Sequence, residues 1–166
     1  RRRADSDYSV RLKEKQRLRA IYNIREAQML RYFNEARRRA GLAGENLVEI
    51  LESRLDALVL RAGFARTIAQ ARQMVVHQHI LVDGKRVDRP SFLVSEGQLI
   101  HVAERSETMV PFQIAATGAH QEVLPDVPGY LDVEIDKLRA TLAREPKRAD
   151  IPVSIQENLV VEHYSR

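Results

Sequence analysis

The stretch of this chain that decides the fold is residues 54–102, which read RLDALVLRAGFARTIAQARQMVVHQHILVDGKRVDRPSFLVSEGQLIHV. Two short helical patterns come first, and a strand-like segment then lies on each side of Asp83-Gly84. Because both central positions of such a turn need a positive φ, these residues predict a tight hairpin over residues 80–87. A further strand is expected at 99–102, and helices followed by antiparallel strands indicate an α+β fold.

Helices are predicted before the hairpin. One begins at Leu47 and continues to Ala62-Gly63, with apolar residues at helical spacing: Leu47, Ile50, Leu51, Leu55, Leu58 and Val59. Gly63 suits a left-handed helix end. Thr67 and Gln70 form a capping box that starts a second, short helix. We expect its buried side to hold Ile68, Ala71 and Val75, and its other side to hold Gln70, Gln73 and His77.

The flanks contain further elements. Residues 8–40 predict two helices, since apolar residues recur at helical spacing in each half. Residues 104–129 carry several Pro and Gly and are expected to form a loop. Residues 131–142 alternate as two strands around a turn but also satisfy a helical stripe, and we favour the hairpin. A polar linker is expected over 146–153, and a short amphipathic segment over 155–164.

Composition restricts the class of protein. The chain has 166 residues, 44% of them hydrophobic, so we expect a packed core. It has no cysteine, which excludes disulfides and thiolate metal sites in these residues. No apolar run approaches the ~20 residues of a membrane-spanning helix. The chain opens on Arg1 rather than Met and shows no signal peptide, so we expect its natural N-terminus to be missing.

The net charge of +4 is distributed unevenly. Residues 1–40 hold 13 Lys/Arg against 5 Asp/Glu, whereas residues 41–166 hold 14 against 18. Within the second part, residues 54–89 have 7 basic and 3 acidic side chains. Two separate basic zones indicate a polyanionic partner contacted in two places, although a solvated surface from an Arg-favouring genome would also explain the bias. Of 27 basic residues 22 are Arg, whose guanidinium binds phosphate oxygens in pairs and stacks on bases.

Several strings in the chain resemble one bacterial family. They are Asp5-Ser6-Asp7-Tyr8-Ser9, Leu12-Lys13-Glu14-Lys15-Gln16, Gly44-Glu45-Asn46-Leu47, Arg54-Leu55-Asp56, Gly63-Phe64-Ala65, Gln70-Ala71-Arg72-Gln73, His77, Val82-Asp83-Gly84 and the ending Val161-Glu162-His163-Tyr164-Ser165-Arg166. Together they are similar to the small-subunit ribosomal protein family called S-four, over essentially the whole chain. The motif at 54–102 alone is shared by several RNA-binding and RNA-modifying proteins, and the flanks make the match specific. The family's N-terminal arm, in which some members carry a cysteine zinc site, is absent from this sequence, and no cofactor is expected.

The resemblance implies two domains. Residues 1–50 with 146–166 would form a helical domain, and residues 51–145 an inserted α/β RNA-binding domain of two short helices and an antiparallel sheet around the core motif 54–102. It also implies a structural constituent of the small ribosomal subunit that is not an enzyme. Such a protein would bind a multi-helix junction in the 5′ domain of 16S rRNA early and nucleate assembly. In the cytoplasmic ribosome it would lie near the mRNA entry path beside neighbouring small-subunit proteins and influence translational accuracy, with no membrane or small-molecule substrate.

The candidate RNA-binding residues form two sets. In the inserted domain they are Arg54, Arg61, Arg72, Gln73, His77, Lys85, Arg86 and Arg89. The cations would hold phosphate, and the amide and imidazole would hydrogen-bond ribose or base. In the helical domain they are Arg11, Lys13, Lys15, Arg17, Arg19, Arg37, Arg38 and Arg39. A-form RNA hides its major-groove edges, so a junction is read largely by shape and phosphate contacts, which suits forked cations on rigid elements.

Some candidates have structural alternatives. Arg54 could instead pair with Asp56 or Glu49 on its helix, as such pairs are common. Gln70 is expected to act as a helix cap rather than an RNA contact. The triplet Arg37–Arg39 is explained in part by the preference for cations at a helix C-terminus.

Catalytic and metal-binding motifs give little support to other functions. His77 and His79 lack a nearby third ligand, so we expect no metal site there. No P-loop, G-x-S-x-G or H-E-x-x-H string occurs, so no phosphate cradle, activated nucleophile or zincin site is expected. Two rival functions remain: an RNA-modifying enzyme that holds its substrate with the same module, and a binder of stalled ribosomal particles.

Overall fold

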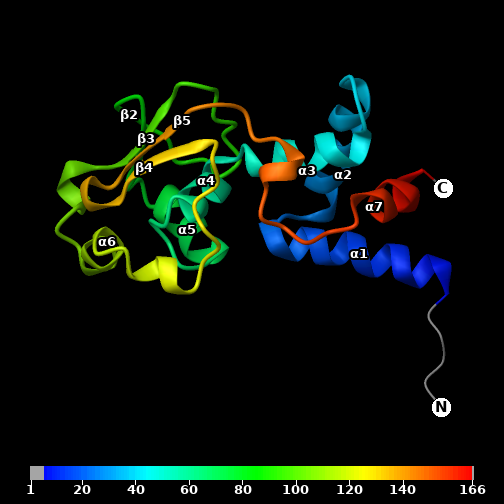
Figure 1. Cartoon of the computed structure of the whole chain (residues 1–166), viewed down its shortest axis with the longest axis horizontal. Coiled ribbons are helices and arrows are strands. Elements are labelled where there is room, and N and C mark those ends of the chain that lie inside the picture. Colours follow the sequence, from blue (N-terminus) through cyan, green and yellow to red (C-terminus); the bar gives the residue numbers. More distant parts are fainter. Residues whose placement is uncertain (1–5, 166) are drawn as a thin grey trace, which may run out of the picture. The chain divides into compact units, whose positions relative to one another are not determined.

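The computed structural model describes residues 6–165, and the chain divides into two compact units (Figure 1). The helical unit comprises residues 1–51 and 153–166, so it is built from both ends of the sequence. The α/β unit comprises residues 52–152. No helix within residues 6–165 is long and apolar enough to cross a membrane.

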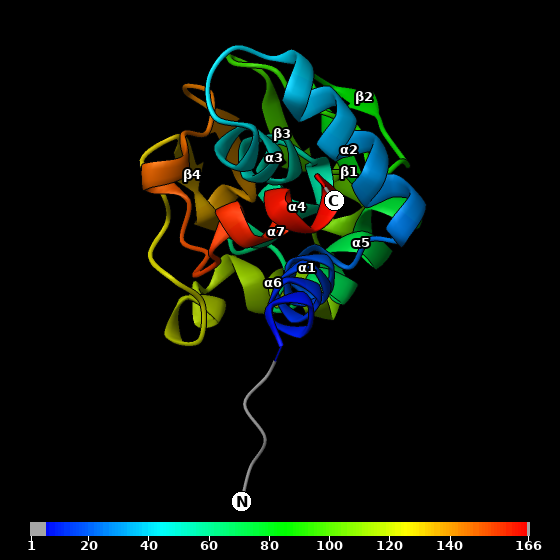
Figure 2. The same ribbon diagram turned by 90° about the vertical axis from the view of Figure 1, so that its right-hand side faces the viewer.

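The helical unit contains α1 (Asp7–Tyr22), α2 (Glu26–Arg38), α3 (Ala43–Glu52) and α7 (Glu157–Tyr164). Its core is formed by apolar side chains from all four helices, among them Leu18, Tyr22, Met29, Phe33, Ala36, Leu47 and Val160. The last helix, α7, lies against the first, α1 (Figure 2). At the start of α3, a Cβ on Gly44 would lie 2.9 Å from Cγ of Glu157, so the approach of α7 to α3 requires glycine there.

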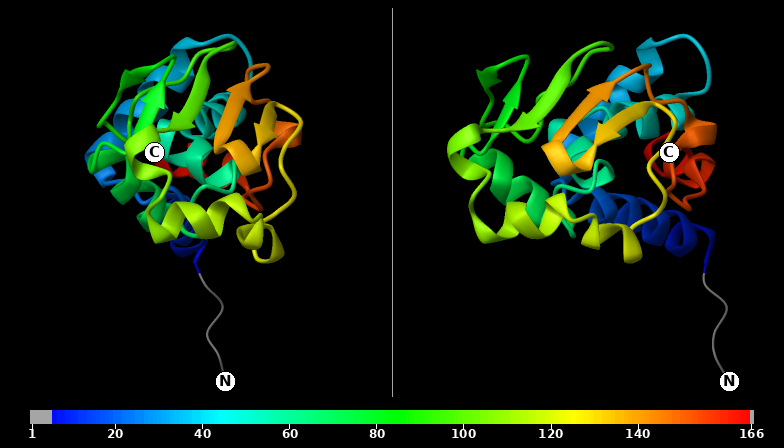
Figure 3. Two further views of the ribbon diagram at one scale, coloured as in Figure 1. Left: turned by 90° about the vertical axis from the view of Figure 1, so that its left-hand side faces the viewer. Right: turned by 60° about the vertical axis from the view of Figure 1, so that its left-hand side comes forward.

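The α/β unit contains α4 (Leu55–Arg61), α5 (Ile68–Val76) and α6 (Val110–Ala116) together with a five-stranded antiparallel sheet. The strands are β1 (Ile80–Val82), β2 (Lys85–Arg86), β3 (Leu99–Val102), β4 (Leu131–Glu134) and β5 (Arg139–Leu142), in the order β2-β1-β3-β5-β4. The three helices lie on one side of the sheet (Figure 3). Buried and less buried residues alternate along β3 and β5, as expected for a sheet with one covered face.

The predicted hairpins are confirmed. Leu81 pairs with Arg86 and Val82 with Lys85 across the turn, in which Asp83 has φ 51° and Gly84 has φ 77°. Oδ1 of Asp83 also accepts a hydrogen bond of 2.9 Å from the backbone N–H of Leu99, which ties the turn to β3. Residues 131–142 form β4 and β5, so the strand interpretation of that segment is right and the helical stripe is not used.

The single helix predicted from Leu47 to Gly63 is two helices, because the chain turns at Ser53 and becomes extended at Arg54. Arg54 has φ −66° and ψ 145° and forms an isolated bridge with Leu93. The carbonyl of Ser53 accepts from the N–H of Val94 at 2.9 Å, and the N–H of Leu55 donates to a distant carbonyl at 2.8 Å. Backbone pairing with a segment some forty residues away therefore overrides the helical repeat. Gly63 ends α4 with φ 84°, as predicted.

The loop predicted over 104–129 is wrong in part, because it contains α6. Pro111 occupies the first turn of this helix, where a missing N–H is tolerated. Phe112 and Ala115 are buried, so α6 packs its apolar side inward. A helix of seven residues is too short to give a strong periodic signal, which explains why the Pro and Gly residues around it dominate the sequence pattern. A further short 3-10 turn, Arg148–Asp150, lies in the predicted linker.

Candidate nucleic-acid interface

Helix α5 presents polar side chains to solvent in the arrangement predicted from its spacing. Thr67 Oγ1 accepts from the N–H of Gln70 at 3.1 Å, so the predicted cap is formed; Oε1 of Gln70 reaches back to the N–H of Arg66 at 2.7 Å, one residue before the cap, and not to that of Thr67. Arg72, Gln73 and His77 are exposed on the helix. Ala71, Met74 and Val75 are buried, and Ile68 is only half-buried, so Met74 is the main buried contact that the sequence reading missed.

Gln78 connects this helix to two further arginines. It follows α5 with a positive φ of 66°. Its side-chain Oε1 accepts a 3.0 Å hydrogen bond from Nη1 of Arg86 on β2, and its carbonyl accepts a 2.9 Å bond from Nη2 of Arg105. The end of α5, the hairpin and the 3-10 turn at Glu104–Ser106 are therefore held together by one residue. The result is a surface of exposed donors that includes Lys85 beside Arg86.

Arg89 extends the basic surface beyond the hairpin. Its side chain is exposed, and its guanidinium lies 5.9 Å from the centre of the Phe92 ring. A cation–π contact of this kind restrains the side chain while leaving its N–H donors free to face solvent. Of the candidates in the α/β unit, Arg72, Gln73, His77, Lys85, Arg86 and Arg89 are thus all on the surface.

Arg54 requires a correction. Its side chain is completely buried, and Nε and Nη2 donate to Oδ1 and Oδ2 of Asp56, each at 3.0 Å. Oδ1 of Asp56 also accepts from the N–H of Ala57 at 2.8 Å. The prediction that Arg54 lines a basic groove is therefore wrong, and the alternative pairing with Asp56 is confirmed. A buried bidentate pair keeps both charges compensated, which makes Arg54 part of the interior of the α/β unit.

Arg61 is likewise held by an acid inside the α/β unit. Its side chain is 9% exposed, and Nε and Nη2 donate to the two oxygens of buried Glu52 at 2.6 and 3.2 Å. The hydroxyl of Tyr130 donates to Glu52 Oε1 at 2.7 Å. Burial, followed by the neighbouring charge of Glu52 and the hydrogen bond to it, raises the pKa of Tyr130 far above its usual value. Arg61 is therefore bound within a group of three side chains, together with Glu52 and Tyr130. The prediction that it lines an exposed basic groove is wrong.

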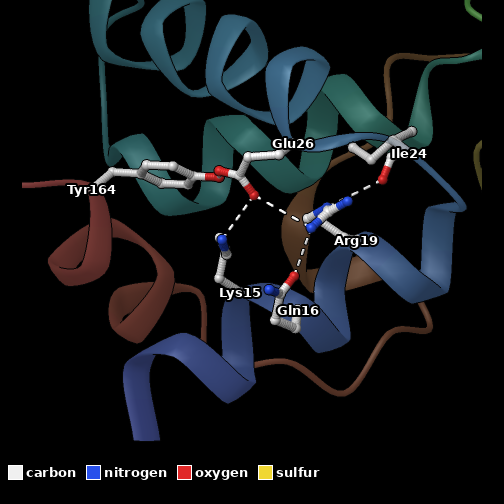
Figure 4. A network of polar contacts seen from close by, with 6 residues as sticks. All are labelled: Lys15, Gln16, Arg19, Ile24, Glu26 and Tyr164. Atoms are coloured by element: carbon white, nitrogen blue, oxygen red, sulfur yellow. Dashed lines mark hydrogen bonds and ion pairs between the residues drawn. The ribbon is translucent and has the colours of Figure 1, made fainter. Parts of the chain in front are cut away.

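In the helical unit, Lys15 and Arg19 converge on one carboxylate, Glu26 (Figure 4). Lys15 Nζ donates to Oε2 of Glu26 at 2.7 Å, and the Lys15 side chain is only 7% exposed. Arg19 lies 3.5 Å from the same oxygen and also donates to the side chain of Gln16 and the carbonyl of Ile24. The expectation that Lys15 faces RNA is therefore wrong, because burial and the ion pair place it in the helix packing.

The pKa of Glu26 reflects this network. Partial burial alone would raise it, but hydrogen bonds from Lys15 and Tyr164 and the positive charges of Lys15 and Arg19 together lower the pKa below its ordinary value. The carboxylate therefore stays ionised at neutral pH. It joins α1, α2 and α7 within the helical unit.

The remaining basic residues of the helical unit are more accessible. Arg17 is exposed but donates to Glu14 at 2.8 Å and to the carbonyl of Ser154. Arg11 is partly exposed, and Lys13 is exposed on the same helix. The triplet at the end of α2 is exposed: Arg37 lies 5.6 Å from the ring of buried Phe33, while Arg38 and Arg39 approach Glu35 at 3.7 and 3.5 Å.

Two arginines that sequence reasoning missed belong to the same surface of the α/β unit. Arg66 is exposed directly before the cap of α5, and Arg105 is exposed where it binds Gln78. Arg66 could have been predicted as an RNA contact, because it directly precedes the helix cap Thr67 and a helix N-terminus attracts anions such as phosphate. Arg105 could not be found from local charge, because Glu104 and Glu107 near it make the net charge of that segment negative.

Comparisons with known proteins show which family the chain resembles. A family model described as the S4 domain matches residues 53–100, and one described as the ribosomal protein S4/S9 N-terminal domain matches residues 1–52. The small ribosomal subunit protein uS4 of Micrococcus luteus is 76% identical over 166 residues, which are 100% of this chain and 80% of the relative. Proteins of the same description from Arthrobacter sp. and Beutenbergia cavernae are 72% and 68% identical over the same shares of each chain.

The fold and these matches define a class first: an RNA-binding ribosomal protein of the small subunit, which acts in translation and is not an enzyme. Within that class, the chain belongs to the family of small ribosomal subunit protein uS4. The predicted recognition and the predicted α+β fold class are both confirmed.

Proposed function

We propose that this chain binds a multi-helix junction in the 5′ domain of 16S rRNA as a primary binder and thereby nucleates assembly of the small subunit. The observation that carries the proposal is the exposed donor surface of the α/β unit. It comprises Arg66, Arg72, Gln73, His77, Lys85, Arg86, Arg89 and Arg105. Forked cations on a rigid helix and hairpin can hold phosphates at fixed spacing, which is how a folded RNA is read by shape.

The helical unit supplies a second contact in this proposal. Arg37, Arg38 and Arg39 are exposed, and Arg38 and Arg39 pair only with the partly exposed Glu35, so they remain able to exchange that partner for phosphates. A surface ion pair contributes about 0–1 kcal/mol, and a phosphate contact replaces it at little cost. Arg11 and Lys13 belong to this contact as well, whereas Lys15 and Arg19 are engaged with Glu26.

The proposal extends to the place of the protein in the ribosome. By resemblance to its family, the bound protein lies in the cytoplasmic small subunit near the mRNA entry path, in contact with neighbouring small-subunit proteins and mRNA. From this position it influences translational accuracy. The exposed apolar residues Tyr8 and Val10 on α1 are available for a protein neighbour, since each is more than a third exposed.

Salt dependence tests the central claim. The full chain is titrated against a folded transcript of the 16S rRNA 5′ domain, and against an unstructured strand of equal length, over a range of salt. If about eight phosphates are neutralised, the logarithm of the binding constant should fall against log salt with a slope near −6 or steeper. Flat binding between low and moderate salt, or equal affinity for the unstructured strand, would show that the exposed cations do not hold a folded rRNA.

A further inference from the structure

A small hollow opens beside the exposed side of α5, between that helix and the start of α6. Its volume is about 150 Å³. Its apolar lining consists of Met74, Met109, Pro111 and Phe112, and its polar lining consists of Gln70, Gln73, His77 and His79. Met74 and Phe112 are buried and Met109 is 42% exposed, so the hollow has an apolar floor and an open, partly apolar rim.

The imidazole of His79 is held in a fixed orientation at this floor. Its Nδ1 lies 2.7 Å from Oγ of fully buried Ser106, and its ring meets the Phe112 ring edge-on with centroids 5.4 Å apart. Burial lowers the pKa of His79, and the charges of Arg105 and His77 lower it further. The ring is therefore neutral at physiological pH and offers one donor and one acceptor nitrogen.

The other polar side chains leave hydrogen-bonding groups unused. Oε1 of Gln70 is occupied by the N–H of Arg66, which leaves the NH₂ group of that amide for another partner. Within residues 6–165, the side chains of Gln73 and His77 form no hydrogen bond, and both are exposed. Donors and acceptors of three residues are thus available around an apolar floor.

The volume of the hollow and the absence of charged residues from its described lining indicate what kind of ligand it can hold. A volume of about 150 Å³ is well below the ~300–1,000 Å³ of ordinary small-molecule sites, so the hollow fits one flat ring system. Among the described residues, no Arg, Lys, Asp or Glu lines it, which makes it a poor site for phosphate. The cations lie around it instead, with Arg72 on the same helix and Arg105 beside Gln78. A neutral heterocycle whose phosphates remain outside matches this distribution.

We propose that the hollow beside α5 receives a single unpaired nucleobase of the bound RNA, with the base lying against Met109 and Pro111 above the buried floor and its edge hydrogen-bonded by Gln73 and His77. The inference rests on the proposed RNA-binding function and names the chemistry that this part of the surface reads. Unpaired bases in RNA are commonly recognised by stacking on side chains together with hydrogen bonds to their edges. The phosphate contacts position the RNA, and this pocket selects a nucleotide.

The test compares the full-length chain with Gln73→Leu, His77→Leu and the matched control Gln113→Leu. Gln113 is exposed on α6 and does not line the hollow, so it undergoes the same chemical change elsewhere. Each protein is titrated against the folded 5′ domain transcript, and base edges are then probed chemically in the complexes. We expect Gln73→Leu and His77→Leu to weaken binding about tenfold or more. The same single nucleotide, protected by the wild type, should become reactive with both. Gln113→Leu should behave like the wild type in both measurements.

The salt slope separates this inference from the proposed function. No cation is removed in these variants, so their slopes should equal that of the wild type. If the wild type binds with the expected slope but both variants also bind with wild-type affinity, the base pocket is refuted and the function stands. A weaker complex without a change at one nucleotide also refutes it, because ribose or phosphate is then the ligand. If the wild type itself shows no salt-dependent binding, the proposed function fails first.

Discussion

The hydroxyl of Tyr164 donates a hydrogen bond of 2.7 Å to Oε1 of Glu26, across 138 positions of the chain. The other oxygen of the same carboxylate accepts from Lys15 at 2.7 Å. The ring of Tyr164 stacks on Phe33 with centroids 4.8 Å apart. The side chain of Glu26 thus joins α1, α2 and α7 of the helical unit. Its contribution to stability can be tested by removing its partners one at a time.

Replacing Tyr164 with Phe should destabilise the helical unit by about 1 kcal/mol, because the ring stacking is kept and only the hydrogen bond to an ionised acceptor is lost. Denaturant unfolding monitored by helix content would measure the change. Tyr8→Phe is the control, since Tyr8 is 60% exposed and the same hydroxyl is removed there. Equal losses in the two variants would mean that the bond to Glu26 contributes nothing.

The lowered pKa of Glu26 predicts a particular dependence on pH. A carboxylate whose pKa is lower in the folded state contributes stability above its unfolded pKa, and this contribution is lost as the pH falls through the folded pKa. The free energy of unfolding of the wild type should therefore fall as the pH drops below the ordinary value of 4.5. Glu26→Gln should start less stable at neutral pH and show a shallower decline. The exposed control Glu96→Gln should keep the wild-type profile; a wild-type decline in Glu26→Gln would contradict the assignment.

Removing the buried guanidinium of Arg54 should affect folding rather than recognition. Arg54→Met leaves Asp56 buried without its partner, and breaking such a pair costs about 3–5 kcal/mol. Arg72→Met makes the same change on an exposed helix position and should alter stability by about 0.5 kcal/mol or less. Urea unfolding of both variants decides the point. A small loss in Arg54→Met would show that the buried pair with Asp56 does not stabilise the α/β unit.

Two positions on α5 should separate binding from stability. Arg72→Ala should weaken binding to the 5′ domain transcript by about 1–3 kcal/mol with little change in Tm, because its side chain is exposed and cationic. Val75→Ala should lower stability by about 2 kcal/mol through a cavity, since Val75 is fully buried. The folded fraction of Val75→Ala should bind with wild-type affinity. Unchanged binding by Arg72→Ala would mean that α5 does not face the RNA.

The isolated α/β unit tests whether the RNA is contacted in two places. Residues 52–152 form a continuous segment with their own sheet and core, so the fragment should fold. Without the exposed arginines of α2, we expect it to bind the transcript about a hundredfold more weakly than the full chain, because two linked sites raise the overall affinity. It should also lose its preference for a junction over a plain duplex. Wild-type affinity in the fragment would assign the arginines of α2 to another partner.

Local chemistry explains which elements could be predicted from the sequence. The turn at Asp83-Gly84 and the cap at Thr67 depend on residues that are neighbours in the chain, so their signals are complete within a few positions. The break at Arg54 depends on backbone pairing with Leu93, a contact that no helical repeat reveals. Helix α6 could not be predicted for a similar reason, because the residues that cover its buried side chains, Phe112 and Ala115, belong to other parts of the α/β unit.

The candidate site divides in the same way. The row formed by Gln73 and His77 follows from helical spacing, and the structure places both on the surface. The burial of Arg54 could not be predicted, because the sequence pattern of an arginine near an aspartate is the same for a buried pair and for an exposed one. The hollow beside α5 combines that helix with Met109 and Phe112, which lie in a segment predicted to be a loop.

The construction of the helical unit from both chain ends has a consequence during synthesis. The α/β unit is a continuous stretch, so all of its residues have been made before α7 is translated. Helices α1 and α2 are made before the α/β unit, yet α7, which packs against α1, is made after it. A nascent chain interrupted before residue 157 would therefore carry a complete α/β unit and a helix α1 whose apolar face is not covered by α7. Chains interrupted at that point should be recognised by chaperones and proteases, because the helical unit cannot cover its apolar side chains until α7 has been made.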